Sequence, residues 1–194
     1  MRDHVRLRVS RHVPTEIPLE DRRNSAVLLL LHEVDGVEHL LFQVRASNLA
    51  VHSGEIGFPG GRWDPTDESL LHTALREVEE EIGVEAAHIE VFGQLDDALT
   101  HSSNYRIRPY AGALALGPRG FVVDAREVHE LLSIPIPYLQ SSDAHGWYPV
   151  QRGEVVEPTP AFVYGEHVIW GATARLLEHF LALIEDVAVT EARP

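Results

Sequence analysis

Three glutamates lie close together in a stretch whose apolar residues repeat with helical spacing. Glu77 and Glu81 are four residues apart, so in a helix they lie one above the other, with Glu80 beside them. Like charges at this spacing repel one another, and Arg76 offsets only part of that repulsion. A divalent cation such as Mg2+, which takes a few carboxylate ligands and bridges to substrate phosphates, would neutralise them. A solvated acidic helix face has the same pattern, so the flanking residues must decide between the two interpretations.

Turn-forming residues on both sides delimit this helix. Residues 57–61 contain three glycines and a proline, which break regular structure, and residues 64–67, Asp-Pro-Thr-Asp, supply turn and N-cap chemistry. The helix is therefore expected to begin near Thr66 to Glu68 and to end at Gly83. One apolar stripe of the helix is expected to face the core: Leu71, Ala74, Leu75, Val78 and Ile82.

The sequence from Arg76 to Val84, REVEEEIGV, resembles at every fixed position the second half of the box that defines the Nudix hydrolases. That half reads Arg-Glu, an apolar residue, any residue, Glu-Glu, any residue, Gly and an apolar residue. The general box has a glycine six residues before its first glutamate. Counting back from Glu68 reaches Arg62, so the loop from Gly61 is one residue longer here. The longer loop is similar to that of the coenzyme A diphosphatase branch.

The segment upstream, residues 45–61, is similar to a motif of the same branch, which ends in Gly, three residues and then Phe-Pro-Gly-Gly. Nearby positions depart from the branch: Phe42 and Gln43 replace a usual Leu-Thr, and Ala50 stands where an arginine is common. The last departure bears on substrate contacts rather than on the chemistry. Alternatively, this is a structural loop whose glycines only satisfy backbone turns. The positions that fit the motif are Ala46, Gly54, Phe58, Pro59, Gly60 and Gly61.

The resemblance implies hydrolysis of a nucleoside diphosphate that is joined to another group. If it extends to the substrate, coenzyme A would be cut into 3′,5′-ADP and 4′-phosphopantetheine. A diphosphate repels a hydroxide nucleophile, so a metal, Mg2+ or Mn2+, must cancel charge and lower the pKa of water. By analogy with the family, Glu77 and Glu81 are the principal ligands, and the Gly60 carbonyl completes the shell. Glu80 is expected to be a further ligand or to orient the water, and Glu68 to bind a second metal or to have a supporting role.

Further roles follow from the same resemblance. Arg76 is expected to fix the carboxylates by hydrogen bonds rather than to touch substrate. The general base stays open among four carboxylates, Glu80, Asp96, Asp97 and Glu127, and Asp96, Asp97 and His101 are also candidates for substrate contacts because they lie in a polar loop, residues 96–104. The predicted substrate-binding residues are Arg45, His52, Gly54, Phe58 and Gly61.

Composition excludes several other classes of function. The formal net charge of −14 argues against nucleic acid or an anionic membrane as a partner. The chain has no cysteine and no lysine, which excludes disulfides, thiol catalysis and lysine chemistry. No apolar run reaches eighteen residues, and the charged stretch 1–10 does not resemble a signal peptide. We therefore expect a cytoplasmic protein; the resemblance implies that it acts on a small molecule, and its oligomeric state is open.

The expected fold class is α/β, a Nudix fold with a mixed β-sheet sandwiched between α-helices. Residues 1–194 are expected to form a single Nudix domain, with an N-terminal arm at about 1–22 that includes a short strand or helix. The chain is expected to enter the last helix within residues 168–174. The expected strands are 25–31 and 39–45, joined by a turn at 34–37, then 89–95, 105–116, a strand end at 121–124, a late strand within 126–139, 147–150 and 161–164.

Two alternatives to coenzyme A hydrolysis stay open. A Nudix hydrolase could take another nucleoside diphosphate derivative, such as ADP-ribose, a dinucleotide or an oxidised nucleotide, because fold and box do not set specificity. A non-catalytic Nudix ligand sensor is the rival from another class. The intact carboxylates Glu77, Glu80 and Glu81 argue against the sensor.

Overall fold

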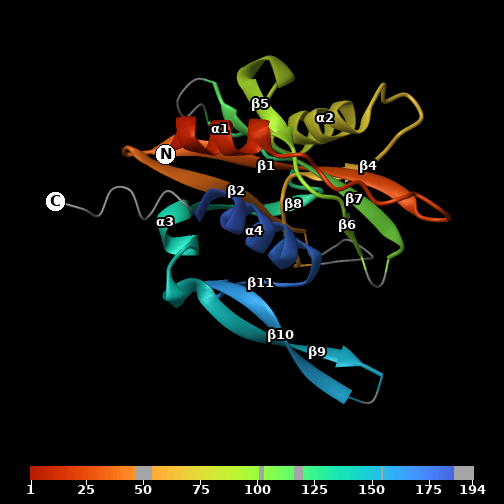
Figure 1. The fold of residues 1–194 in the computed structure, drawn as a ribbon, viewed down its shortest axis with the longest axis vertical. Coiled ribbons are helices and arrows are strands. Elements are labelled where there is room, and N and C mark those ends of the chain that lie inside the picture. Colours follow the sequence, from red (N-terminus) through yellow and green to blue (C-terminus); the bar gives the residue numbers. More distant parts are fainter. Residues whose placement is uncertain (47–53, 101–102, 116–119, 154, 186–194) are drawn as a thin grey trace.

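The fold is that of a computed structural model, and the structure describes residues 1–46, 54–100, 103–115, 120–153 and 155–185 (Figure 1). The predicted site residue His52, together with Ala50 and His101, lies outside the described residues. None of the helices that the structure describes is long and apolar enough to cross a membrane. In chain order the elements are α1 (Arg2–Arg11), β1 (Arg23–Val34), β2 (Val37–Arg45), β3 (Ile56–Gly57), β4 (Gly60–Arg62), α2 (Leu70–Ile82), the 3-10 turn Ala86–His88, β5 (Ile89–Gln94), β6 (Ala98–Leu99), β7 (Tyr105–Leu114), β8 (Val128–Pro135), α3 (Ile136–Leu139), the 3-10 turn Ser142–Ala144, β9 (His145–Arg152), β10 (Val155–Tyr164), β11 (His167–Ile169) and α4 (Gly171–Ile184).

The apolar run at 25–31 forms the middle of β1, as predicted, and β1 is the central strand of the main sheet. This sheet has the order β3-β2-β1-β7-β5, and β4, β8 and β6 pair with β1, β2 and β7 respectively. β1 runs parallel to β7 and antiparallel to β2 and β4, so the sheet is mixed. The turn at 34–37 joins β1 to β2, which confirms the predicted hairpin.

Helices cover both faces of this sheet, which confirms the predicted layers (Figure 1). Successive residues of β1 point to opposite faces because side chains alternate along a strand. Leu28 and Leu30 pack with α2, whereas Leu29 and Leu31 belong to the core that contains α1 and α4. α2 therefore lies on one face of the sheet, and α1 and α4 lie on the other.

The N-terminal segment is a helix followed by an extended stretch, which decides between the two structures that the sequence allowed. Val5 and Val9 of α1 are buried in the core with Phe180 of α4. The helix therefore packs against the sheet, and the extended stretch after it corresponds to the predicted arm.

A second sheet of three antiparallel strands, with the order β11-β10-β9, extends away from the main sheet (Figure 1). The sequence predicted only short strands at 147–150 and 161–164, because prolines and polar residues interrupt the apolar pattern around them. In the structure β9 and β10 form a long hairpin that pairs Val155 with Arg152 and Phe162 with His145. α4 then begins at Gly171, where the sequence placed the last helix.

The start predicted for α2 is wrong by at least two residues. The helix begins at Leu70, and Ser69 is its N-cap, since the Ser69 side chain accepts a hydrogen bond of 3.1 Å from the backbone N–H of His72. Residues 64–67 form a separate turn, in which the Asp67 N–H donates to the Asp64 carbonyl. The helix ends at Gly83, which has the left-handed conformation (φ 70°), as predicted.

The strand end predicted at 121–124 is also wrong. These residues are not in a strand. They lie beside the C-terminal end of α2 in space. The Val122 N–H donates to the carbonyl of Ile82, and the Asp124 N–H donates to the carbonyl of Glu81. The backbone of this segment thus satisfies carbonyl groups that a helix end leaves without partners.

Candidate active site

Glu81 is buried on α2, where its carboxylate faces β2 and β4, and only 2% of the residue is exposed. The Gln43 side chain donates a hydrogen bond of 2.7 Å to Oε1, and the Gly60 backbone N–H donates one of 2.9 Å to Oε2. Burial raises the pKa of Glu81 to about 7, although both hydrogen bonds act in the opposite direction. The carboxylate is therefore held in a fixed orientation in surroundings that penalise its charge.

The carboxylate of Glu77, one turn before Glu81, lies directly against the Cα of Gly61. A Cβ atom at Gly61 would come within 2.4 Å of the Glu77 Cδ atom, so a residue with a side chain would have to displace the carboxylate. Burial raises the pKa of Glu77, and the neighbouring Arg76 opposes this shift. A glycine is therefore needed here for the close approach of a carboxylate.

The backbone of Gly60 lies directly against the neighbouring strand β1, just as that of Gly61 lies against Glu77. Its φ of +148° favours glycine, and a Cβ atom would lie 2.3 Å from the Ala26 carbonyl oxygen, so any side chain would collide with backbone. The Gly60 N–H holds Glu81, and the role predicted for the Gly60 carbonyl stays a prediction. The two glycines thus let the loop pass between β1 and α2.

Arg76 links three carboxylates on one side of α2. Its guanidinium donates to both oxygens of Asp67 at 2.9 and 3.0 Å. One nitrogen, Nη1, also donates to Glu77 and Glu80, at 3.0 Å each. Asp67, whose side chain is fully buried, is held ionised, because the Arg76 guanidinium keeps the pKa of that carboxyl far below its usual range. Asp67, in the turn at 64–67, therefore fixes the Arg76 guanidinium, which orients Glu77 and Glu80.

The donor set at this end of α2 fits a hard divalent cation. Glu77 and Glu81 offer carboxylate oxygens, both have raised pKa values because they are desolvated, and Arg76 neutralises only one side of the cluster. A cation near the two carboxylates would replace the solvation that burial removes. All the side-chain donors are oxygens, the ligand type that Mg2+ and Mn2+ take.

The sequence matches the model of the NUDIX domain over residues 21–157, which is well over half of the chain. The chain belongs to the Nudix family. It is a pyrophosphohydrolase of the class that acts on small nucleotide derivatives with divalent metal ions.

Two relatives are similar to this Nudix hydrolase over most of its length. It is 35% identical over 163 residues to the mitochondrial coenzyme A diphosphatase NUDT8 of Homo sapiens, a match that covers 83% of this chain and 69% of the human protein. It is 33% identical over 166 residues to the uncharacterized Nudix hydrolase NudL of Photorhabdus laumondii, covering 84% of this chain and 86% of that one. These matches extend beyond the motif to most of the sequence.

One solved structure gives the likeness in three dimensions. The crystal structure of a C. elegans Ap4A hydrolase binary complex superposes with a TM-score of 0.54 at 15% identity, and the match covers 84% of this chain and 98% of that one. At this identity the likeness shows the Nudix fold alone.

Of the four candidates for the general base, two lie near Glu77 and Glu81, the predicted metal ligands of this Nudix hydrolase. The Glu80 side chain is 59% exposed beside Glu77, and the Glu127 charge is close enough to contribute to the raised pKa of Glu77. The prediction that Asp97 could serve is wrong, because its side chain is fully buried and accepts two hydrogen bonds of 2.9 Å from Arg108. Asp96 is not at this site either, since its contacts are with the segment after α1 and with α4.

The structure brings some of the predicted substrate-binding residues together and separates others. Arg45 ends β2, and its charge opposes the raised pKa of Glu81. Gly54 lies beside it, since the Gly54 N–H donates to the Arg45 carbonyl at 3.1 Å. Phe58 is buried and stacks on Phe42 with ring centroids 4.7 Å apart, so its side chain packs in the core.

Glu68 lies in the exposed turn before α2, where its backbone N–H donates to the His72 ring at 3.3 Å. Arg76 donates to Asp67 rather than to Glu68. Support of a second metal by Glu68 stays a prediction.

Two residues of the site were not identified from the sequence. Gln43 was noted only as a departure from the branch motif, yet its side chain donates a hydrogen bond to Glu81. The sequence contained one indication of this role. Gln43 lies two residues after Leu41, which puts it on the face of β2 that α2 covers. Asp67 was interpreted as an N-cap residue. No local pattern distinguishes a capping aspartate from one that is buried against a distant arginine.

Replacement of Asp67 by asparagine is expected to lower the free energy of unfolding at pH 7 by about 3 kcal/mol, because it leaves the Arg76 guanidinium without its buried partner. The pKa of Asp67 is lowered in the folded state, so this stabilisation is present above its unfolded pKa of 3.8 and is lost as the pH falls below that value. Urea unfolding at pH 7 and pH 3 measures both effects.

The matched control for this variant is Asp64→Asn, which changes an exposed aspartate of the same turn. It should leave the unfolding midpoint nearly unchanged. Equal losses in the two variants would show that the turn, rather than the buried ion pair, is responsible.

Proposed function

We propose that this Nudix hydrolase cleaves the diphosphate bond of coenzyme A, or of a coenzyme A derivative, and releases 3′,5′-ADP and 4′-phosphopantetheine. The observation that carries the proposal is the segment 45–61, which joins the branch motif to a loop one residue longer than the general Nudix box. The similarity to a human protein named as a coenzyme A diphosphatase supports it. The finer assignment of substrate rests on these resemblances, because the fold accepts many substrates.

The carboxylates of Glu77 and Glu81 would hold the divalent cation, Mg2+ or Mn2+, with Glu80 and the Gly60 carbonyl as further ligands. When bound, the cation would cancel charge on the diphosphate and lower the pKa of the attacking water. Gln43 keeps Glu81 in place, and Arg76 keeps Glu77 and Glu80 in place. We propose Glu80 or Glu127 as the group that takes a proton from the water.

The substrate beyond the diphosphate would extend into a cleft of about 390 Å³ next to Gly54. Glu55 and Ile56 form one side of the cleft, and β11 forms another. Tyr148 and Trp170 also line it, and their rings stack with centroids 4.8 Å apart. An aromatic wall beside the motif loop suits an adenine ring or the pantetheine arm, because both present apolar faces.

The test is product analysis after the purified protein has been incubated with coenzyme A and either Mg2+ or Mn2+. We expect 3′,5′-ADP and 4′-phosphopantetheine in equal amounts, and neither product when a chelator is present. Cleavage of ADP-ribose or another diphosphate but not of coenzyme A would support the proposed metal-binding role of α2 and would reject coenzyme A as the substrate. Failure to cleave any of these compounds would favour the ligand sensor.

The partner that we propose is a small molecule only. Location in the cytoplasm and a single domain over residues 1–194 stay predictions.

A further inference from the structure

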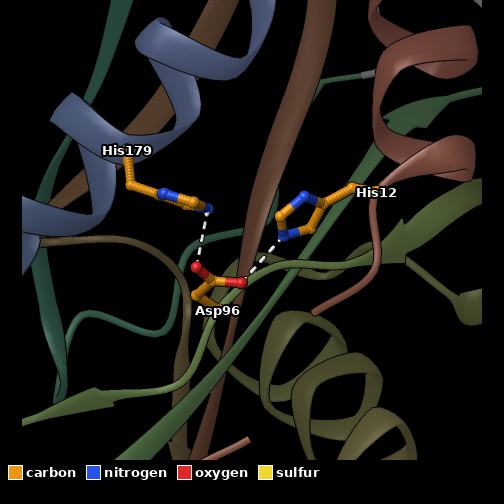
Figure 2. A group of neighbouring side chains, drawn as sticks. All are labelled: His12, Asp96 and His179. Atoms are coloured by element: carbon orange, nitrogen blue, oxygen red, sulfur yellow. Dashed lines mark hydrogen bonds and ion pairs between the residues drawn. The ribbon is translucent and has the colours of Figure 1, made fainter. Parts of the chain in front are cut away.

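Two histidines and an aspartate meet away from the Nudix carboxylates (Figure 2). His12 Nε2 lies 2.8 Å from Asp96 Oδ1, and His179 Nε2 lies 3.8 Å from Asp96 Oδ2. The two imidazole rings are 5.4 Å apart at an angle of 61°. Figure 2 shows one ring nitrogen of each histidine pointing at the Asp96 carboxylate. All three potential ligand atoms lie within 4.8 Å of one another.

Rigid elements hold this cluster together. His12 directly follows α1, Asp96 follows β5, and His179 lies on α4. α1 and α4 are packed through the core, and the Arg8 side chain donates to the Leu183 carbonyl at 2.8 Å. The three side chains therefore come from parts of the chain far apart in sequence that the fold fixes relative to one another. They lie on the face of the sheet opposite α2, so they form no part of the proposed diphosphate site.

Hydrogen bonding among these residues leaves one nitrogen unsatisfied. Asp96 Oδ1 already accepts two hydrogen bonds, from the Thr15 N–H at 2.8 Å and from His12. His179 Nε2 is buried and has no hydrogen-bond partner among the described residues, since 3.8 Å from Asp96 is too long for a hydrogen bond. A buried ring nitrogen without a partner is costly, and a cation placed among the three residues would use its lone pair.

We propose that His12, Asp96 and His179 bind a Zn2+ ion, separately from the Nudix metal centre. Two imidazole nitrogens and one carboxylate oxygen suit Zn2+, whereas Mg2+ prefers oxygen ligands alone. Tetrahedral Zn2+ with bonds of about 2.1 Å requires ligand atoms about 3.4 Å apart. His12 contacts Oδ1 at 2.8 Å and His179 contacts Oδ2 at 3.8 Å, and the three ligand atoms lie within 4.8 Å of one another, so side-chain rotations would bring them to this spacing. A water molecule completes the fourth position.

The bound ion would join the end of α1 to α4 and to the loop after β5. The Thr15 N–H supports the site, because it orients the Asp96 carboxylate as the partners of metal ligands commonly do. His12 and His179 are partly exposed, so the ion can exchange with solvent. The expected effect is stabilisation of the contact between the two ends of the described chain.

The proposal is tested by Zn2+ binding to the full chain while Mg2+ in excess occupies the Nudix carboxylates. We expect one Zn2+ per chain by equilibrium dialysis. At a free Zn2+ concentration one hundred times the dissociation constant, we expect Tm to rise by roughly 5 to 10 °C. Co2+ substituted for Zn2+ should give the intense visible absorption of a four-coordinate ion. No stoichiometric binding, or binding without a change in Tm, would overturn the proposal.

Variants then locate the ion. His179→Ala and Asp96→Asn should each weaken Zn2+ binding at least tenfold, and the amide introduced by Asp96→Asn keeps an oxygen that can accept from the Thr15 N–H. The matched control is His129→Ala, which removes an exposed histidine of β8 and should bind Zn2+ as the unchanged chain does. Glu81→Gln should also retain the binding, because it changes only the Nudix centre.

Circular dichroism and metal-dependent diphosphate hydrolysis verify that each cluster variant is folded. If His179→Ala does not fold, Asp96→Asn and His12→Gln provide the same comparison. Zn2+ binding that survives all the cluster variants, or that disappears in Glu81→Gln, would show that the ion binds elsewhere and would overturn the assignment.

Discussion

Replacement of Glu81 by glutamine should lower kcat/KM for diphosphate hydrolysis more than about a hundredfold, because even the partners of metal ligands change activity by 10- to 100-fold. The chain should stay folded. Glutamine has the same shape, and its carbonyl can accept the hydrogen bond from the Gly60 N–H or from Gln43. The measurement is steady-state turnover with Mg2+ at several concentrations, with circular dichroism as the control. Turnover near that of the unchanged enzyme would reject the metal model.

The same variant should remove a pH dependence from the stability of the metal-free protein. The pKa of Glu81 is raised from its ordinary 4.5 to about 7 by burial. Its contribution to stability is therefore present below pH 4.5 and is lost as the pH rises through 7, a loss of about 3 kcal/mol. Glu81→Gln removes this term, so the variant should gain stability relative to the unchanged protein between pH 5 and pH 8 in chelator. Parallel stability curves for the two proteins would contradict this account.

Replacement of Gly61 by alanine should weaken metal binding and turnover while the fold survives. The new Cβ atom would lie 2.4 Å from the Glu77 carboxyl carbon, and that carboxylate, at the end of a flexible side chain, must move away. The Mg2+ concentration needed for half-maximal activity should rise at least tenfold if Glu77 is a principal ligand as proposed, since its carboxylate is displaced. Activity titrated with Mg2+ gives this value directly.

The matched control for Gly61→Ala is Gly57→Ala, four residues earlier. A Cβ atom there would meet only the Thr173 hydroxyl at 3.9 Å, an ordinary contact, so activity and metal dependence should hardly change. Gly60→Ala differs from both, because the new Cβ would collide with backbone atoms of β1, and it should fail to fold. If Gly61→Ala and Gly57→Ala behaved alike, the contact between Gly61 and Glu77 would not control the metal site.

Local patterns in the sequence predicted much of the fold. The apolar run of β1, the turn at 34–37 and the glycine at 83 each identify an element without reference to distant residues. The acidic box on α2 likewise belongs to one helix, so its spacing alone predicts which carboxylates share a side. These features are local in sequence, and they were predicted for that reason.

The misassigned residues are those whose partners are distant. Asp67 has the sequence context of a helix cap but is buried against Arg76, and Asp97 has the context of an exposed loop but is buried against Arg108. Residues 121–124 have apolar character, yet their backbone bonds to the end of α2. In each case a tertiary contact determines the structure, and the spacing of residues in the sequence does not predict that contact.

The parallel pairing of β1 with β7 affects the order in which the molecule can fold during synthesis. Residues 23–31 pair with residues 105–113, so the centre of the sheet is incomplete until β7 has left the ribosome. α2 rests on β1 and on Tyr110 and Leu114 of β7, and therefore lacks part of its support until then. Closing so long a segment before the contact forms costs chain entropy and slows folding. A nascent chain that ends before residue 105 should thus expose the part of the apolar stripe of α2 that β7 later covers, a surface that a chaperone could bind.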